Sequence, residues 1–382
     1  MRRTGKIYSI ILAIFFLIWI LVPFLNDCFQ FYSEPSVSKR ENRTLARKPL
    51  FNINLLDPYP KAYETYFKDH FVFREPLLQA HSFLNFFYLN RSPDPDQVDI
   101  GKEKWLFNGG DDKLIYQGKK NLTRDQIQAI VQILHKRALY YHGKGIRFYV
   151  CFAPMTQEIY PEYLPNNYFR SPNGTQTDKL IAAILKDMVI PFIDLKSALI
   201  ASKKFGRLYQ KTDNHWNCFG GFFAYSAIIE RMKKDFPLLK PLKKSDVIFK
   251  PTSRKGGPLA ITIGFDKMLK EDDFLPSIKN MHAMTGPKAG YPPPYWFAYK
   301  DEYENVYVNV DQTLPKLFVI RDSFFDFTML FLRENFSKTV VIWDAWMYGA
   351  NKPLIEKEKP NVVLLMIAEP LIGKILDAPP DY

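Results

Sequence analysis

Cysteine is scarce in this sequence. The 382 residues contain only three, at positions 28, 151 and 218. Three cysteines cannot all pair, and their spacing lacks the paired pattern of a zinc site, so we predict neither a disulfide framework nor a cysteine-ligated metal. Cys151 lies in an apolar run and is expected to be buried. Cys218 is a weak candidate nucleophile because a serine is better placed.

Several ligand-binding signatures are also missing. The chain has no P-loop, no glycine-rich dinucleotide fingerprint and no internal repeat. We therefore predict no cofactor and no metal. A hydrophobic content of 47% and an aromatic content of 16% argue against disorder, and 28 prolines indicate long ordered loops.

Acidic residues are fewer than basic ones, which gives a formal net charge of +12. The excess is concentrated between Arg231 and Gly257, where nine Lys or Arg residues face only Asp235 and Asp246. A basic stretch favours contact with an anionic polymer or with phospholipid head groups. The alternative interpretation is a solvated loop that keeps the protein soluble.

One long apolar run, from Ile7 to Leu25, follows Met1, Arg2, Arg3 and Lys6. Its length suffices for one transmembrane helix, and the basic flank belongs on the cytoplasmic side. No small-residue cleavage site follows it, so we expect an uncleaved signal anchor over residues 1–26. This predicts a single-pass protein of the cell membrane whose remaining chain is extracytoplasmic, a compartment in which nucleic acid is not an expected partner.

The remaining chain has the pattern of an α/β protein. We expect a juxtamembrane and helical region over 27–100, then a catalytic domain over 101–382 with an irregular basic and aromatic insertion at about 236–312. Short apolar runs alternate with amphipathic segments, which predicts a parallel sheet with helices on both faces. The expected strands are 146–152, 190–194, 316–320, 339–343 and 362–367, and the expected helices are 123–141, 177–188, 216–234 and 324–334.

Ser323 is the best candidate nucleophile. It lies between the strand 316–320 and a helix, and such a turn exposes the hydroxyl beside free amides. A serine needs a base, and the base needs a third group that fixes its tautomer. His215 has Asp213 two residues before it, whereas His70, beside Asp69, is the main competitor. The alternative for Asp213 is a helix cap with an imidazole nearby.

The segments TDNHWN and RDSF resemble the SGNH-hydrolase-like families typified by the alginate O-acetyltransferases AlgJ and AlgX and by the DHHW proteins. Further matching segments are ENRTLARKP, YFKDHFVFR, GKEKWLF and APMTQEIYPEYLP, at residues 41–49, 66–74, 101–107 and 153–165. The resemblance implies an SGNH-hydrolase-like, flavodoxin-like α/β fold and a triad of Ser323, His215 and Asp213. It makes His70 a structural residue.

The chain departs from the family pattern at a few positions. Asn214 stands where the DHHW name has a histidine, and Met155-Thr156-Gln157 replaces a segment that often carries a lysine. The step Gly256-Gly257-Pro258 replaces a glycine-aspartate pair. These changes concern the choice of substrate more than the nucleophile.

The resemblance implies a membrane-anchored polysaccharide O-acetyltransferase that works through an acetyl-serine. Its partners would be a polysaccharide acceptor and a membrane-bound O-acyltransferase that delivers acetyl groups. An acetylesterase with the same triad and a non-catalytic scaffold of an export complex are the alternatives. The oxyanion would bind the Ser323 amide, helped by Arg321, Asn214 or Thr156. Five aromatic residues of the insertion, which pack on pyranose rings or cap the core, are Tyr291, Tyr295, Trp296, Phe297 and Tyr299.

Overall fold

The computed structural model describes all residues except 1, 30, 33–36, 39–42, 54–55 and 379–382. The chain divides into two compact units, residues 1–94 with 261–264, and residues 95–260 with 265–382. The first unit contains the long helix α1 (Arg2–Phe29) and the helices α2 (Pro58–Asp69) and α3 (Arg74–Phe83), with a π-turn at Leu84–Tyr88 and short strands β1 (Val37–Ser38) and β2 (Arg43–Thr44).

Helix α1 contains the predicted membrane segment. Its residues Tyr8–Asn26 have a mean hydropathy of 2.6, and this segment is long and apolar enough to cross a bilayer. In the same unit the His70 ring packs on Tyr66 and its Nε2 donates to the carbonyl oxygen of Ala46 at 2.8 Å. His70 thus ties two segments of this unit together.

The second unit is built on a seven-stranded sheet with the order β6-β5-β13-β11-β12-β10-β9. Its strands are β5 (Arg147–Ala153), β6 (Phe192–Ile193), β9 (Ala283–Thr285), β10 (Glu304–Asn309), β11 (Lys316–Ile320), β12 (Lys338–Ile342) and β13 (Val362–Ala368). The first five strands of this order run parallel, as predicted.

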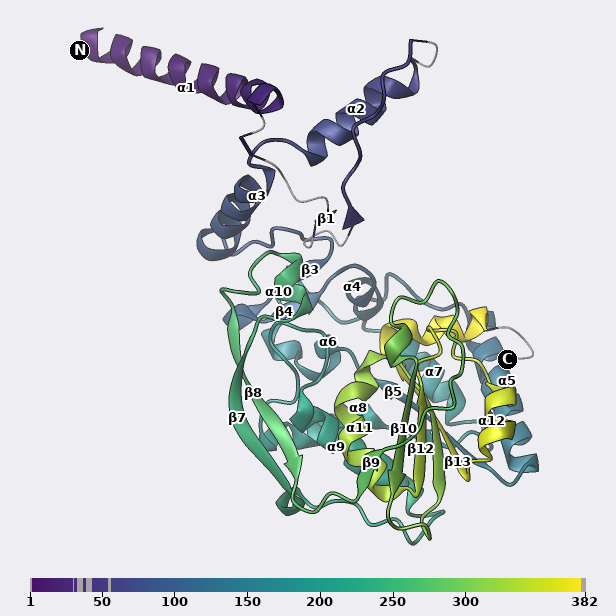
Figure 1. Ribbon diagram of the computed structural model, residues 1–382. Coiled ribbons are helices and arrows are strands. Elements are labelled where there is room, and N and C mark those ends of the chain that lie inside the picture. Colours follow the sequence, from purple (N-terminus) through teal and green to yellow (C-terminus); the bar gives the residue numbers. More distant parts are fainter. Residues whose placement is uncertain (1, 30, 33–36, 39–42, 54–55, 379–382) are drawn as a thin grey trace. The chain divides into compact units, whose positions relative to one another are not determined.

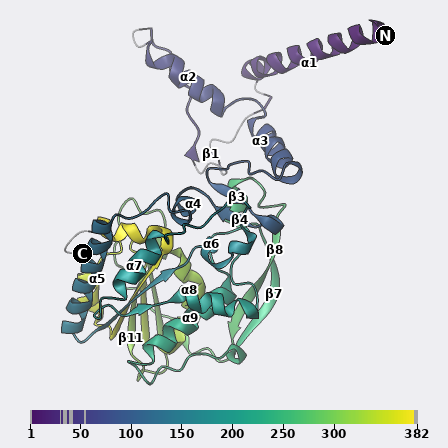
Figure 2. The same cartoon turned by 180° about the vertical axis from the view of Figure 1, so that it is seen from behind.

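Helices cover both faces of this sheet (Figures 1 and 2). Alternate residues of the strands point to opposite sides. Tyr149, Leu317 and Val319 belong to the core under α8 (Leu195–Ser202), α9 (Cys218–Met232) and α11 (Asp326–Leu332). Val150 and Phe318 belong to the core under α5 (Arg124–Gly143) and α7 (Gln176–Ile184). The remaining helices are α4 (Gly110–Tyr116), α6 (Thr156–Ile159), α10 (Pro258–Thr262) and α12 (Lys352–Glu358).

The sheet is mixed at one edge, where two antiparallel strands extend the predicted parallel ones. Strand β10 pairs antiparallel with both β12 and β9. The region 236–312 is therefore not irregular throughout, since it supplies the edge strand β9, its neighbour β10, and the antiparallel ribbon β7 (Val247–Lys255) and β8 (Lys270–Ile278). Pro251 and several charges hide this ribbon in the sequence. A two-stranded ribbon tolerates them because much of it faces solvent.

The segment before α9 is a loop and not the start of a helix. Asn217 caps α9, its Oδ1 accepting from Gly220 N at 2.9 Å, and the helix begins at Cys218. Asp213 and His215 consequently lie in the loop that precedes the cap. The short strands β3 (Val98–Ile100) and β4 (Leu106–Asn108) form another antiparallel ribbon, which precedes the strands of the main sheet in the chain. Cys151 is buried, as expected.

Candidate active site

Ser323 lies in the turn that follows β11. It opens a 3₁₀ turn, Ser323–Phe325, that leads into α11. The preceding Asp322 caps this turn, since its Oδ1 accepts from Phe324 N at 3.0 Å. The N–H of Ser323 has no acceptor within the turn, because it stands at the first helical position. The turn thus offers a half-buried hydroxyl and a free amide at one point.

Asp322 fixes the turn from beneath. Its Oδ2 accepts from the Tyr348 hydroxyl at 2.8 Å and from Ala368 N at 2.6 Å. Burial raises the pKa of this carboxyl, although these donors and the charge of His215 act against the rise. Asp322 thereby joins the ends of three neighbouring segments and stabilises the turn.

The structure brings Ser323, His215 and Asp213 together. His215 Nε2 lies 2.8 Å from Ser323 Oγ, and His215 Nδ1 lies 2.7 Å from Asp213 Oδ1. The residues come from two loops 108 positions apart, both at the carboxyl edge of the sheet. The His215 ring also packs on Phe324, with 4.7 Å between ring centroids. This is the order of contacts that a nucleophile, a base and an orienting carboxylate require.

Asp213 and His215 each stabilise the charged form of the other. Burial opposes protonation of His215, but the hydrogen bond and charge of Asp213, with the charges of Asp322 and Asp326, raise its pKa overall. Burial likewise disfavours ionised Asp213, yet His215 and Arg254 lower its pKa overall. The side chain of Asp213 is 6% exposed, so its charge acts through a medium of low dielectric. A carboxylate in this position stabilises the protonated form of the His215 imidazole.

The ribbon β7–β8 supports Asp213 from behind, a contact that no sequence motif predicts. Arg254 on β7 places NH2 3.7 Å from Asp213 Oδ2, and its NH1 lies 3.8 Å from Asp273 on β8. Gly257, just after β7, packs so closely that a Cβ would lie 2.9 Å from the Cβ of Asp213. A side chain at this position would displace the loop. No local pattern marks these contacts, because the ribbon is distant in sequence from the histidine loop.

Glu271 on β8 clamps the same loop. Its Oε2 accepts from Lys211 N at 2.6 Å and Arg207 NH1 at 2.7 Å, and its Oε1 accepts from the Thr212 hydroxyl at 2.5 Å. The Thr212 Oγ1 in turn accepts from Gly257 N at 2.8 Å. Glu271 is buried, and its acceptor capacity is used by donors at the base of the loop. The network holds the loop that carries Asp213 and His215 against the ribbon.

Of the predicted oxyanion helpers, Asn214 lies within the triad loop and Thr156 lies beside it. The Thr156 hydroxyl, at the start of α6, donates to the carbonyl oxygen of Asn214 at 3.1 Å. Arg321 is placed differently, because it is 1% exposed and its NH1 contacts Asp326 Oδ1 at 2.9 Å. Its guanidinium is thus committed to a neighbouring carboxylate. Tyr295 and Trp296 are exposed and, in the part of the chain that the structure describes, make no hydrogen bond or ring contact with the triad.

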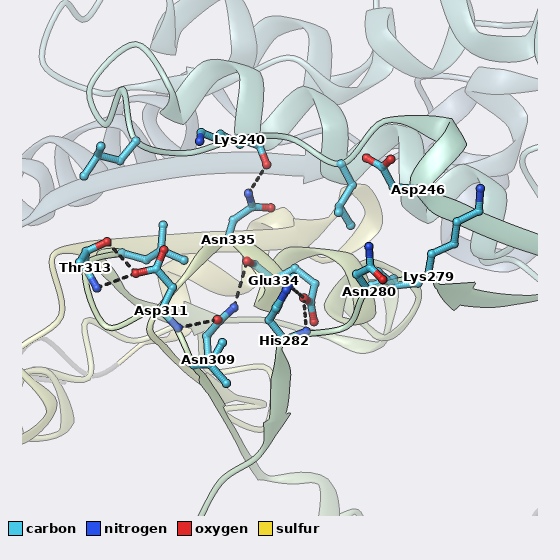
Figure 3. Close-up of a pocket in the computed structure, with 15 residues that line it drawn as sticks. Lys240, Asp246, Lys279, Asn280, His282, Asn309, Asp311, Thr313, Glu334 and Asn335 are labelled. Atoms are coloured by element: carbon cyan, nitrogen blue, oxygen red, sulfur yellow. Dashed lines mark hydrogen bonds and ion pairs between the residues drawn. The ribbon is translucent and has the colours of Figure 1, made fainter.

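A cavity of about 560 Å³ lies at the other end of the sheet (Figure 3). Thr313 and Asn335, which line it, precede β11 and β12, whereas Ser323 follows β11. Its buried polar groups bond to one another: Glu334 accepts from His282 N at 2.8 Å, and Asn335 donates to Lys240 O at 2.6 Å. The cavity is separate from the triad. Within the described residues, no group of three His, Cys, Asp or Glu is arranged to hold a metal.

Two known proteins, AlgX and AlgJ, are similar to part of this chain. The family model of the SGNH hydrolase-like domain of the acetyltransferase AlgX matches residues 98–280, which include Asp213 and His215 but not Ser323. The probable alginate O-acetylase AlgJ of Pseudomonas syringae pv. tomato is 24% identical over 182 residues. That match spans 47% of this chain and 44% of AlgJ, less than half of either protein.

Solved structures share the fold. Bacillus cereus PatB1 aligns with a TM-score of 0.54 at 17% identity, over 71% of this chain and 95% of PatB1. Its structure with a sulfonyl adduct aligns with a TM-score of 0.52 at 16% identity, over 72% of this chain and 97% of that one. The predicted SGNH-like α/β fold and the resemblance to AlgJ and AlgX are confirmed.

Proposed function

The chain carries an SGNH hydrolase-like domain similar to that of the acetyltransferase AlgX, and on this basis we propose that it is an O-acetyltransferase acting on a polysaccharide. One observation carries the proposal: His215 bridges Ser323 and Asp213 with contacts of 2.8 and 2.7 Å. We further propose that the protein is anchored by α1 and acts outside the cytoplasmic membrane.

The proposed reaction has two steps. Ser323 Oγ attacks the carbonyl carbon of an acetyl donor while His215 Nε2 takes its proton, and the imidazolium then protonates the leaving group. An acetyl-serine results. In the second step His215 accepts a proton from a sugar hydroxyl, whose oxygen attacks the acetyl carbonyl. The bond to Ser323 Oγ breaks as the His215 imidazolium returns the proton to that oxygen. The N–H of Ser323 is the proposed donor to the oxyanion of both tetrahedral intermediates.

The proposed acceptor is a polysaccharide, and the proposed donor partner is a membrane-bound O-acyltransferase. The similarity to AlgJ, whose name describes an alginate O-acetylase, supports the acceptor class. A partner is needed because the extracytoplasmic side has no soluble acetyl-coenzyme A. With water as the acceptor the same triad gives an acetylesterase, so the ratio of transfer to hydrolysis distinguishes the two.

Intact mass spectrometry of the detergent-solubilised protein after incubation with 4-nitrophenyl acetate tests the proposal. We expect the wild type to gain the mass of one acetyl group, located on the peptide that contains Ser323. Ser323→Ala and His215→Ala are each expected to abolish the adduct, because members of a triad fail together. Ser277→Ala, an exposed serine of β8, is the matched control and should acylate normally. An adduct of wild-type yield on Ser323→Ala would return the protein to a scaffold role.

A further inference from the structure

Four aromatic residues form a cluster beyond the carboxyl ends of β11 and β12. We call Phe297, Tyr299, Trp343 and Trp346 the aromatic platform. Tyr299 stacks on Trp343 with 4.9 Å between centroids and 12° between planes. Trp346 packs edge-on against Trp343 at 5.4 Å and against Phe297 at 5.6 Å. The cluster is therefore a set of mutually supported rings.

The platform is connected to the nucleophile by the strand register. Ile320 pairs with Ile342, so Arg321 and Trp343 leave the sheet side by side. The Arg321 guanidinium lies 4.6 Å from the centre of the Trp343 ring. Ser323 follows Arg321 by two residues, a chain length of at most about 7 Å. The platform thus adjoins the turn that carries the hydroxyl.

The loop that bears Trp346 has a strained backbone. Ala345, Trp346 and Tyr348 have φ values of 56°, 61° and 47°, in the left-handed region that such residues rarely adopt. The Asp344 carboxylate holds the loop by accepting from Gly349 N at 2.9 Å. Tyr348 of this loop also donates to Asp322, directly before Ser323. One rigid loop therefore sets both the platform and the nucleophile turn, and strain of this kind is concentrated at functional sites.

One face of the platform is open. Trp343 is 4% exposed, but Tyr299, which stacks on it, is 47% exposed. Because one face of the Tyr299 ring lies on Trp343, the exposed area belongs to its outer face and edges. Tyr295 and Trp296, the residues expected from sequence, are 90% and 52% exposed and have no ring contact within the described part of the chain. They lack the support that pre-orients Tyr299.

We propose that the aromatic platform is the acceptor subsite, where a pyranose ring of the polysaccharide stacks on the outer face of Tyr299. This proposal rests on the proposed function and names its acceptor-binding residues. A pyranose presents a face of C–H bonds, which suits the negative face of an aromatic ring. Arg321 is buried and paired with Asp326, so its guanidinium is not free to bind an anionic group of the sugar.

Affinity electrophoresis tests the subsite with the full-length protein in detergent. Native gels would contain alginate, hydroxyethyl cellulose or glycol chitin. We expect at least one polymer to retard the wild type. Tyr299→Leu keeps apolar bulk on Trp343 but removes the flat ring, and should weaken binding about tenfold. Tyr299→Phe should restore binding, and Tyr295→Ala is the control that should bind as the wild type does.

Acylation by 4-nitrophenyl acetate, measured on the same samples, separates this proposal from the proposed function. We expect the wild type to acylate whether or not a polymer is present, because formation of the acetyl-serine does not require the acceptor. Equal retardation of wild type and Tyr299→Leu, or no retardation of the wild type by any polymer, would overturn the subsite even if acylation is normal. Ring-dependent retardation without acylation of the wild type would overturn the enzymatic function but leave sugar binding at the platform.

Discussion

His215 is the residue whose charge state controls the proposed chemistry. It acts as a base only when neutral, and Asp213 raises its pKa above the ordinary value of about 6.5. We predict that the burst rate with 4-nitrophenyl acetate falls as the pH falls through the His215 pKa. The midpoint of this acidic limb should lie above that of an unperturbed histidine. Stopped-flow measurement of the burst from about pH 5 to about pH 9 would locate it.

Asp213→Asn supplies the matched test of the same pH profile. The amide cannot raise the His215 pKa by charge, so the acidic limb should move to lower pH. The rate should also fall, on the order of 10⁴-fold, because the tautomer control is lost. An acidic limb in the same place in both proteins would show that Asp213 does not act on His215 as the 2.7 Å contact implies.

Gly257 packs against Asp213, so the size of the residue at this position controls where the Asp213 carboxylate lies. An alanine Cβ would lie 2.9 Å from the Asp213 Cβ and 3.0 Å from the Thr212 carbonyl oxygen, so the backbone must shift. We predict that Gly257→Ala lowers the acylation rate by about 10²-fold, the effect of a displacement of about 1 Å in a catalytic group. The free energy of unfolding should fall by about 1–3 kcal/mol.

The control is Gly143→Ala, at the end of α5, where an added Cβ meets no atom within 4 Å. Its acylation rate should equal that of the wild type. Burst kinetics and urea unfolding of both variants give the comparison, and equal rates for the two alanine variants would contradict the packing argument.

At the scale of elements, the ribbon β7–β8 works as a support for the histidine loop. Glu271 is the point of attachment, since it accepts from Arg207, Lys211 and Thr212. We predict that Glu271→Gln lowers the free energy of unfolding by up to about 3 kcal/mol, because it leaves Arg207 without its charged partner. The side chain of Arg207 is 22% exposed, and solvent limits the loss. Acylation should slow as well.

Asp272→Asn, next to Glu271 but exposed, is the control and should change stability by no more than about 0.5 kcal/mol. Chemical denaturation and burst kinetics measure both effects. If Glu271→Gln lost stability but kept the full acylation rate, the ribbon would stabilise the fold without positioning the triad.

The ribbon and the edge strands also show where prediction from sequence stops at this scale. The parallel strands were predicted because each is a continuous apolar run buried on both faces. Strands β7 and β8 are partly exposed and contain charges and proline, and β10 is a short strand that begins with Glu304. None of them is the long continuous apolar run by which the parallel strands were predicted. Only their pairing partners make them strands.

At the scale of the whole molecule, α1 is the predicted membrane anchor. Its segment Tyr8–Asn26 has a mean hydropathy of 2.6. We predict that the full-length protein stays in membranes after an alkaline wash. A variant in which a cleavable signal peptide replaces residues 1–26 should be soluble outside the cytoplasm. Fractionation and immunoblotting would show this, and a full-length protein released by the wash would contradict anchoring.

The same truncated variant should acylate at the wild-type rate, because the triad lies entirely within the unit formed by residues 95–260 and 265–382. The division of the chain at residues 26 and 100 stays a prediction. Loss of acylation in a soluble, folded truncation would mean that the first unit contributes to the chemistry.

The sequence by itself determined the five parallel strands, four of the helices that accompany them, the apolar N-terminal helix and the candidate residues Ser323, His215 and Asp213. Each of these depends on local patterns: periodicity, a strand-to-helix turn, and an Asp two residues before a His. That the three side chains meet was decided by the fold, which brings loops 108 residues apart to one edge of the sheet. Their catalytic role stays a prediction.

Only the tertiary structure decided what surrounds the triad. Arg254 and Glu271 support Asp213 and its loop from a ribbon that has no local signal, and Arg321 is turned inward by Asp326. Tyr299, and not the more exposed Tyr295, is held flat because Trp343 from a distant strand lies beneath it. Such contacts form between segments far apart in the chain, so no spacing within one segment encodes them.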